Sequence, residues 1–335
     1  MITDTQDATA LLANIQQLVA TDFDQLDHLL QEQLQSKIPF IQEVIQYIIN
    51  SGGKRLRPLV VILSARAAGT QGNREYLELA TVIEFIHTAT LLHDDVVDES
   101  RMRRGRQTAN ERWGNHSSIL VGDFLYSRAF QVLATRSNVP VMKVLANATN
   151  IIAEGEVLQL LNIADLELTQ ARYINVIQYK TAMLFEAASH IGALLGNLNP
   201  TQINALRLYG RNLGIAFQIA DDVLDYSADI HLLGKSVGDD LSEGKLTLPL
   251  IFALKQCGVS DKKMIANVLQ QDEIVTTEQL LDIIQVIKKT NASEQALTVA
   301  ESYTKAAIDH LQFVPSSKYQ QALIDLAQFA IARNY

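Results

Sequence analysis

The chain has 335 residues, and its 28 Lys and Arg against 37 Asp and Glu give a net charge of −9 with His neutral. This acidic balance argues against nucleic acid as a partner, because binding to a phosphate backbone needs a basic surface. The single cysteine, Cys257, excludes an internal disulfide and a zinc site built on cysteines. Hydrophobic residues make up 48% of the chain and charged residues 19%, which is typical of a globular protein with a large core.

The first thirty residues do not resemble a targeting segment. They contain five aspartates and no Lys or Arg, whereas a secretory signal needs a basic start and an apolar stretch. No later stretch approaches the ~18 consecutive apolar residues of a membrane span. We therefore expect a cytoplasmic protein.

Apolar residues recur at helical spacing along nearly the whole chain. The pattern predicts helices at residues 8–35, 38–50, 57–69, 73–98, 117–136, 139–163, 169–195, 201–226, 247–256, 260–270, 276–290, 292–312 and 317–333. Glycine and proline are scarce, at 16 and 6 residues, which favours long helices over many turns. No strand pattern and no linker interrupt the series, so we expect one all-α domain over residues 1–335. Two polar segments, 99–115 and 227–246, are expected to be non-helical.

One pattern of aspartates occurs twice, each time near the end of a predicted helix: DDVVD at 94–98 and DDVLD at 221–225. Within each, the first and fifth residues share a helix face about 6 Å apart. Like charges at that spacing, near a helix C-terminus, destabilise the helix, and a bound cation is the simplest compensation. Carboxylates suit Mg²⁺, which also binds phosphate oxygens. The alternative is a pair of solvated acidic helix ends.

The helix faces that carry these aspartates become apolar with distance from them. His87 and Thr90 lie on the stripe of Asp94, and Gln218 lies on that of Asp221. This predicts a cavity with a charged mouth and an apolar interior. For His87 the alternative is a hydrogen-bonded core residue.

Basic residues alternate with the aspartates along the chain. They are Lys54, Arg55, Arg57, Arg103, Arg104, Lys180, Lys235 and Lys245. The first three follow a Gly-Gly pair and precede a helix, which suits phosphate binding, although the spacing is not that of a P-loop. Lys180 lies in an apolar helix, where an unpaired charge would be costly. Each could be an ordinary surface charge, but together they fit a site for two polyanions bridged by metal ions.

Seven stretches together resemble a known family. They are GGKRLRP (52–58), IEFIHTATLLHDDVVDESRMRRG (83–105), VGDFLYSRAF (121–130), AEGEVLQL (153–160), YKTAMLFEAA (179–188), FQIADDVLDY (217–226) and GKSVGDDLSEGKLTLPL (234–250). The chain resembles the trans-polyprenyl diphosphate synthases, most of all bacterial octaprenyl and nonaprenyl diphosphate synthases that make quinone side chains. The similarity covers most of the chain and is strongest across residues 50–250.

The resemblance implies a bundle of long antiparallel helices around a deep central cavity, and a homodimer. Asp94 and Asp98 would bind two Mg²⁺ ions, and Asp221 with Asp225 a third, which makes about three ions per active site. The allylic diphosphate would contact Arg103, Lys180, Thr181, Gln218 and Lys235. Isopentenyl diphosphate would contact Lys54, Arg57, His87 and Arg104. The middle aspartates, Asp95 and Asp222, are expected to lie next to the metal ligands without binding the ions directly.

The implied reaction begins with ionisation of an allylic diphosphate, such as farnesyl diphosphate, assisted by Mg²⁺ and cationic side chains. The double bond of isopentenyl diphosphate attacks the carbocation, a proton passes to the released pyrophosphate, and apolar walls exclude water. In the family, bulky aromatic residues just before the first aspartate motif stop elongation early. Here those positions are Ala89 and Thr90, so a long product is expected. Phe130, Val132 and Met142 are candidates for the cavity floor.

Several alternatives remain open from the sequence. A terpene cyclase shares the first motif, but its second metal motif usually mixes Asn, Ser or Thr with Glu. A metal-dependent phosphohydrolase could use the pair His93-Asp94, but would leave the second motif unexplained. A non-catalytic subunit of a heteromeric synthase tends to lose the aspartates, and a shorter-chain synthase would share both motifs. The very apolar product of a long-chain enzyme also predicts transient membrane contact at release.

Overall fold

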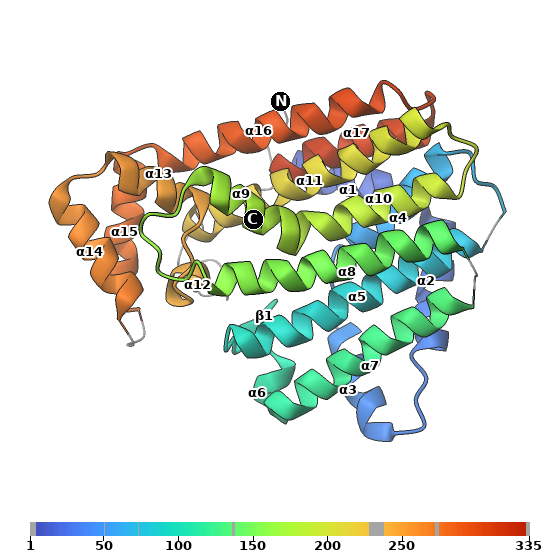
Figure 1. Ribbon diagram of the computed structural model, residues 1–335, viewed down its shortest axis with the longest axis horizontal. Coiled ribbons are helices and arrows are strands. Elements are labelled where there is room, and N and C mark those ends of the chain that lie inside the picture. The colour runs from blue at the N-terminus through green and yellow to red at the C-terminus, as the bar shows by residue number, and fades with distance from the viewer. Residues whose placement is uncertain are drawn as a thin grey trace.

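Long helices lying side by side make up most of this computed structural model, which describes residues 5–49, 51–72, 74–135, 138–227, 238–271 and 275–332 (Figure 1). The helices of the first half are α1 (Thr5–Leu18), α2 (Ala20–Gln33), α3 (Pro39–Ile49), α4 (Leu56–Ala67), α5 (Glu75–Val97), α6 (Ala109–Trp113), α7 (Asn115–Ala134) and α8 (Val139–Leu160). Those of the second half are α9 (Gln170–Ile177), α10 (Met183–Leu194), α11 (Pro200–Ser227), α12 (Asp239–Ser242), α13 (Leu248–Gln256), α14 (Val259–Gln270), α15 (Thr277–Lys289), α16 (Ala292–Leu311) and α17 (Lys318–Ile331). The predicted all-α class is confirmed.

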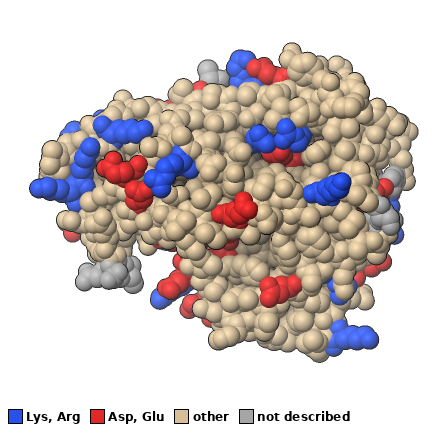
Figure 2. All heavy atoms as spheres, viewed as in Figure 1, with Lys and Arg blue, Asp and Glu red and all other residues tan. Residues whose placement is uncertain are grey.

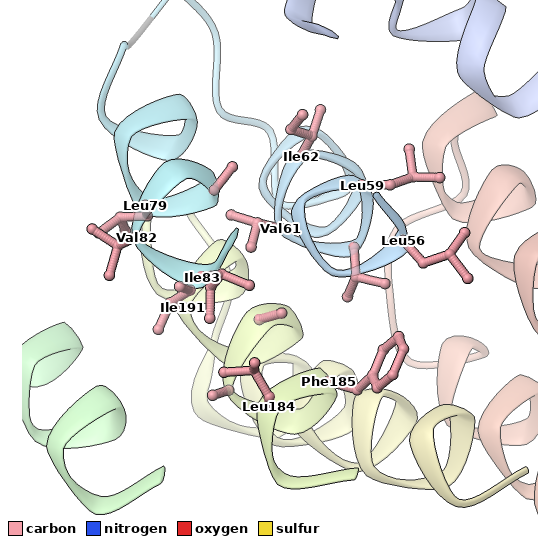
Figure 3. Close-up of a cluster of buried hydrophobic side chains, with 14 of the residues drawn as sticks. Leu56, Leu59, Val61, Ile62, Leu79, Val82, Ile83, Leu184, Phe185 and Ile191 are labelled. Carbon is pink, nitrogen blue, oxygen red and sulfur yellow. The ribbon is translucent and has the colours of Figure 1, made fainter. Parts of the chain in front are cut away.

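The centre of the bundle is the packing of α4, α5 and α10 (Figure 3). Leu59, Ile83 and Phe185 are almost fully buried in one continuous hydrophobic cluster. Gly192 on α10 allows the two backbones to approach, because a Cβ there would lie 2.7 Å from the carbonyl oxygen of Val61 on α4. The part of α5 that precedes the first aspartate cluster is therefore held in place by close hydrophobic packing.

A second hydrophobic cluster holds the end of α11. Leu213 belongs to the central cluster, whereas Ile219 packs with residues of α9 and α13 to α16. Because α11 passes through both clusters, its last turns are held against the same bundle as α5.

The predicted helix over 8–35 is wrong in one respect, because the chain breaks at Val19, with φ −121° and ψ 25°. The break lets α1 pack against α17 while α2 packs against α5. Apolar periodicity alone did not reveal it, because both halves bury their apolar faces, including Leu12 and Leu26.

The expectation of no strands and of a non-helical segment at 99–115 also needs correction. Strands β1 (Met102–Arg103) and β2 (Arg106–Gln107) form a small antiparallel hairpin, and α6 follows it. Its two turn residues, Arg104 and Gly105, have φ of 53° and 74°, as a type I′ turn requires. In the other polar segment, α12 lies within 238–246.

The predicted helix over 169–195 is present but contains one turn of π-helix, η1 (Gln178–Ala182), between α9 and α10. Such turns occur often at functional sites. This one carries Lys180 and Thr181. In the described part of the chain, no helix is both long and apolar enough to cross a membrane.

Candidate active site

A cavity of about 680 Å³ lies between α4, α5, α8, η1 and the C-terminal half of α11. Its walls include most of the candidate residues: Lys54, Arg57, His87, Thr90, Asp94, Asp98, Arg103, Arg104, Lys180, Thr181, Gln218 and Asp221. Apolar side chains such as Leu91, Ile177 and Phe217 share these walls. The predicted combination of charged and apolar walls in one cavity is therefore present.

The first aspartate cluster lies where α5 ends, and cations from distant segments face it. The Nζ of Lys180 is 3.9 Å from Asp94, and the Nζ of Lys245 is 2.8 Å from Asp98. Burial raises the pKa of Asp94, while Lys180 opposes the shift. Lys245 also pairs with Glu243, whose other oxygen accepts a hydrogen bond from Ser100 at 3.3 Å.

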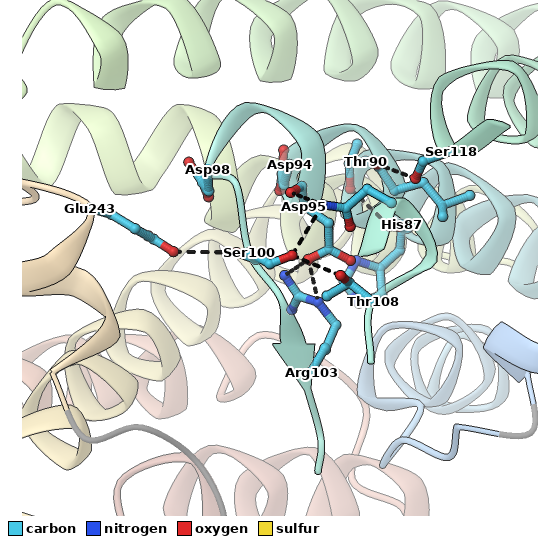
Figure 4. A network of polar contacts seen from close by, with 12 residues as sticks. His87, Thr90, Asp94, Asp95, Asp98, Ser100, Arg103, Thr108, Ser118 and Glu243 are labelled. Carbon is cyan, nitrogen blue, oxygen red and sulfur yellow. Dashed lines mark hydrogen bonds and ion pairs between the residues drawn. The ribbon is translucent and has the colours of Figure 1, made fainter. Parts of the chain in front are cut away.

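The middle aspartate of this cluster is not among the described residues that line the cavity, and its side chain points toward Arg103 (Figure 4). Asp95 is only 4% exposed and pairs with Arg103 on the hairpin, at 2.8 Å from Nε and 2.7 Å from Nη2. Asn110 donates to its main-chain carbonyl at 3.0 Å. Asp95 therefore ties the hairpin to α5, and this contact holds Arg103 at the cavity edge.

In the second cluster the middle aspartate is part of a chain of hydrogen bonds. Thr181 donates to Gln218 at 2.9 Å, and Gln218 donates to Asp222 at 2.7 Å. The hydroxyl of Tyr173 donates to the other oxygen of Asp222. Burial raises the pKa of Asp222 to about 7, although both hydrogen bonds oppose the shift. The network orients Thr181 and Gln218 at the cavity wall.

One candidate residue, Asp225, is placed differently from the other aspartates of the two clusters. Asp225 is not among the described residues that line the cavity, and its carboxylate accepts hydrogen bonds from the backbone N–H groups of Gly238 and Asp240, at 3.3 and 3.4 Å. Lys235 lies outside the described residues.

The other end of the cavity is basic. The Nη1 of Arg57 donates to the Nε2 of His87 at 3.0 Å, so the proton of the neutral ring is on Nδ1. Burial lowers the pKa of Arg57 to about 10, and burial together with Arg57 and Arg104 lowers that of His87 well below its usual value. The guanidinium of Arg57 also lies over the ring of Phe185, 4.5 Å from its centre.

The absence of a side chain at Gly53 allows Arg104 to reach the basic end of the cavity. A Cβ at Gly53 would lie 2.7 Å from the Nη1 of Arg104, and its φ of 154° also disfavours a side chain. Glu84, which the sequence analysis did not single out, lines the cavity nearby and faces Arg55, Arg57 and Arg104. Burial raises the pKa of Glu84, and the three guanidinium groups oppose the shift.

The two small residues before the first cluster differ in position. Thr90 lines the cavity and donates to the carbonyl of His87 at 2.8 Å, whereas Ala89 is fully buried in the helix packing. The three candidates for the cavity floor do not line it: Phe130 packs on Tyr126, Val132 is buried, and Met142 is 36% exposed.

Two further wall residues, Glu156 and Tyr173, were not predicted from the sequence. The carboxylate of Glu156 is 2.7 Å from the Nζ of Lys180. Burial, and after it the negative charge of Asp94, raises the pKa of Glu156 to about 7. A charged residue beside a glycine in an apolar helix was the available signal for Glu156. Nothing in the pattern around Tyr173 pointed to the site.

The donor set fits a hard divalent cation. Asp94, Asp98 and Asp221 present carboxylate oxygens to one cavity. Within the described ranges no three His, Cys, Asp or Glu side chains converge as ligands of a single ion. That arrangement suits Mg²⁺, which usually binds one or two carboxylates together with waters and phosphate oxygens.

Comparison with known proteins identifies the family of this chain. A family model described as polyprenyl synthetase matches residues 38–287, and the chain belongs to this family. Octaprenyl diphosphate synthases of Haemophilus influenzae and Escherichia coli are 44% and 45% identical to it, over 96% of this chain and 97% and 99% of theirs. A crystal structure of a polyprenyl synthase from Caulobacter crescentus, complexed with calcium and isoprenyl diphosphate, is 41% identical. The match covers 96% of this chain and 98% of that one, with a TM-score of 0.92. The protein is thus a prenyltransferase with the helical fold of the polyprenyl synthases.

Proposed function

We propose that the protein extends an allylic diphosphate, with farnesyl diphosphate as primer, by repeated condensation with isopentenyl diphosphate. The product is octaprenyl or nonaprenyl diphosphate for quinone side chains. One observation carries the proposal: a single cavity joins the carboxylates of Asp94 and Asp221 to the basic end at Arg57. Because α11 belongs to both hydrophobic clusters, residues 1–335 are proposed to act as one domain.

The two ends of the cavity suit two diphosphates. The allylic diphosphate is assigned to the aspartate end, with Arg103, Lys180, Thr181, Gln218 and Lys235 as its contacts. Isopentenyl diphosphate is assigned to the basic end, with Lys54, Arg57, His87 and Arg104 as its contacts. The first assignment is supported by the position of Lys180 beside Asp94, and the second by the Arg57–His87 contact.

Mg²⁺ is the proposed cofactor, with about three ions held by Asp94, Asp98, Asp221 and Asp225. Such ions, when bound, stabilise the negative charge that develops on the departing diphosphate. Asp225 would have to share its carboxylate with the backbone of residues 238–240.

The chain's own side chains can perform the remaining work. The ammonium of Lys180 is aimed at the aspartate end, where it stabilises negative charge on the leaving group. The apolar residues Leu91, Ile177 and Phe217 exclude water from the carbocation. No side chain need remove the final proton, because the released pyrophosphate can accept it.

The small side chains of Ala89 and Thr90 support a long product, as do the octaprenyl diphosphate synthases among the relatives. Since Thr90 lines the cavity, Thr90→Phe is expected to shorten the product. Ala89→Phe is a weaker test, because overpacking a fully buried position typically costs about 1–3 kcal/mol. Unchanged product lengths in a folded Thr90→Phe variant would remove this residue from length control.

The decisive experiment is to incubate the purified chain with farnesyl diphosphate, isopentenyl diphosphate and Mg²⁺. A ladder of prenyl diphosphates ending at eight or nine units supports the proposal. A ladder that ends early indicates a shorter-chain synthase, and a cyclic hydrocarbon or free phosphate indicates a cyclase or a phosphohydrolase. No turnover until a second protein is added indicates a subunit of a heteromeric enzyme.

A homodimer is proposed from the surface of α7 and α8. Leu120, Val157 and Leu161 are 66%, 56% and 73% exposed, and the face that α8 crosses carries only scattered charges (Figure 2). Sedimentation should give twice the mass of the chain, and Val157→Asp with Leu161→Asp should give the monomer. A monomeric wild type would contradict this proposal.

Transient membrane contact at product release is proposed from the apolar character of the product. Exposed lysines near the ends of α13, α14 and α15, among them Lys255, Lys262 and Lys289, can attract an anionic lipid surface. Flotation with anionic but not zwitterionic vesicles is expected, and its absence with product bound would contradict the contact.

A further inference from the structure

Lys180 lies between two carboxylates and is closer to the one that the aspartate motifs do not include. Its Nζ is 2.7 Å from Glu156 on α8 and 3.9 Å from Asp94 on α5. All three side chains line the cavity. A single ammonium therefore faces two carboxylates, and its closer ion pair is with Glu156.

The backbone explains why Glu156 reaches this position. A Cβ at Gly155 would lie 2.7 Å from the backbone nitrogen of Lys180 and 2.9 Å from the carbonyl carbon of Tyr179. Only glycine allows α8 to approach the π-helical turn so closely. The next residue on α8 then carries its carboxylate to the lysine that this turn presents.

We propose that Glu156 is a positioning residue that holds the ammonium of Lys180 away from Asp94. Asp94 thereby keeps its oxygens available to a divalent cation, and the ammonium stays directed at the allylic diphosphate. The inference rests on the proposed function of this site.

The physical reason is competition between the two carboxylates. Ionic attraction falls with distance, and the lysine stem is flexible enough to follow the stronger partner. Without the charge of Glu156, the carboxylate that remains within ion-pair distance of Lys180 among the described residues is that of Asp94, at 3.9 Å. The Lys180–Asp94 ion pair would then become closer and would have to break before a metal ion could bind.

The test compares Glu156→Gln with Glu154→Gln, a matched change on the same helix. Glu154 is exposed and accepts a hydrogen bond from Asn150 at 2.8 Å. Calorimetry measures the Mg²⁺-dependent binding of a thio-linked farnesyl diphosphate analogue that cannot ionise. Glu156→Gln should weaken this binding about tenfold and raise the Mg²⁺ concentration needed for it. The KM for isopentenyl diphosphate should stay within about twofold, and Glu154→Gln should change neither quantity.

A double-mutant cycle separates positioning from a general effect on the fold. If Glu156 acts through Lys180, Glu156→Gln should add little to the loss of analogue binding caused by Lys180→Gln. Full additivity, or a Glu156→Gln variant that binds like Glu154→Gln, would overturn the inference. If Glu156→Gln does not fold, Glu156→Ala, which also removes the charge, takes its place, and the same two results are decisive.

The wild type in the same assays distinguishes a failure of the proposed function from a failure of the role of Glu156. Failure of the wild type to extend farnesyl diphosphate contradicts the proposed function. A wild type that elongates normally, beside a Glu156→Gln variant equal to its control, contradicts only the role of Glu156.

Discussion

The two aspartate clusters have nearly the same sequence, yet the protein surrounds them differently. At the first cluster, Lys180 and Lys245 face Asp94 and Asp98, and Arg103 binds the middle aspartate. At the second, Asp222 accepts hydrogen bonds from the neutral groups of Tyr173 and Gln218. The last aspartate, Asp225, accepts hydrogen bonds from backbone N–H groups.

The difference shows that the repeated sequence pattern places the aspartates on a helix but does not determine which residues contact them. The two lysines at the first cluster come from the π-helical turn and from the segment after α12, both remote in sequence, whereas Arg103 comes from the hairpin that follows α5. The neutral partners at the second cluster come from α9 and from α11 itself. The first cluster is thus ready to exchange cationic side chains for metal and substrate, whereas the middle of the second is held by neutral hydrogen bonds.

The largest effect should come from removing the charge of one ligand in each cluster. Asp94→Asn and Asp221→Asn should each lower kcat by about 100- to 1,000-fold, because each removes stabilisation of the departing diphosphate. Steady-state kinetics at saturating Mg²⁺ measures this. A variant within threefold of the wild type would show that its cluster does not take part.

The residues that bind the two middle aspartates should contribute different amounts to the free energy of unfolding. Arg103→Gln removes a charged partner of buried Asp95 and should lower the free energy of unfolding by about 2 kcal/mol. Urea denaturation in the absence of substrate measures the loss. Arg106→Gln, on the exposed strand β2, is the control, and an equal loss there would contradict the role of the Arg103–Asp95 pair.

At the second cluster, Tyr173→Phe removes one neutral hydrogen bond to Asp222 and should cost about 1 kcal/mol. The same denaturation experiment applies. If Tyr173→Phe lowers the free energy of unfolding more than Arg103→Gln does, the proposed contrast is contradicted. That contrast is between a first cluster stabilised by ion pairs and a second stabilised by neutral hydrogen bonds.

The smallest effect concerns pH at the basic end. The folded protein lowers the pKa of His87 through burial and nearby arginines. As pH falls below about 6.5, the unfolded chain gains a proton that the folded protein does not, so stability decreases. His87→Gln should therefore lose less stability between pH 7.5 and pH 5 than the wild type, as measured by urea denaturation at each pH. Equal slopes for wild type and His87→Gln would contradict this assignment.

Sequence patterns predicted the elements that depend on local periodicity. Both aspartate clusters lie at the ends of long helices, as expected, and the apolar stripe beside Asp94 leads into a cavity. The break at Val19 and the π-helical turn at 178–182 were not predictable in this way, because packing against other helices selects them.

The same limit applies to the site. Lys180 was recognisable as a charge in an apolar helix, but its partner Glu156 depends on the approach of α8 at Gly155. Tyr173 reaches Asp222 only through the packing of α9 on α11. A one-dimensional pattern contains neither contact.

The central claim is that both clusters act on one diphosphate. A crystal structure with Mn²⁺ and the thio-linked farnesyl diphosphate analogue tests it most directly, because anomalous scattering locates each ion. We expect ions at bonding distance from Asp94, Asp98 and Asp221, all shared with one diphosphate. Ions at a single cluster, or a diphosphate bound outside this cavity, would contradict it.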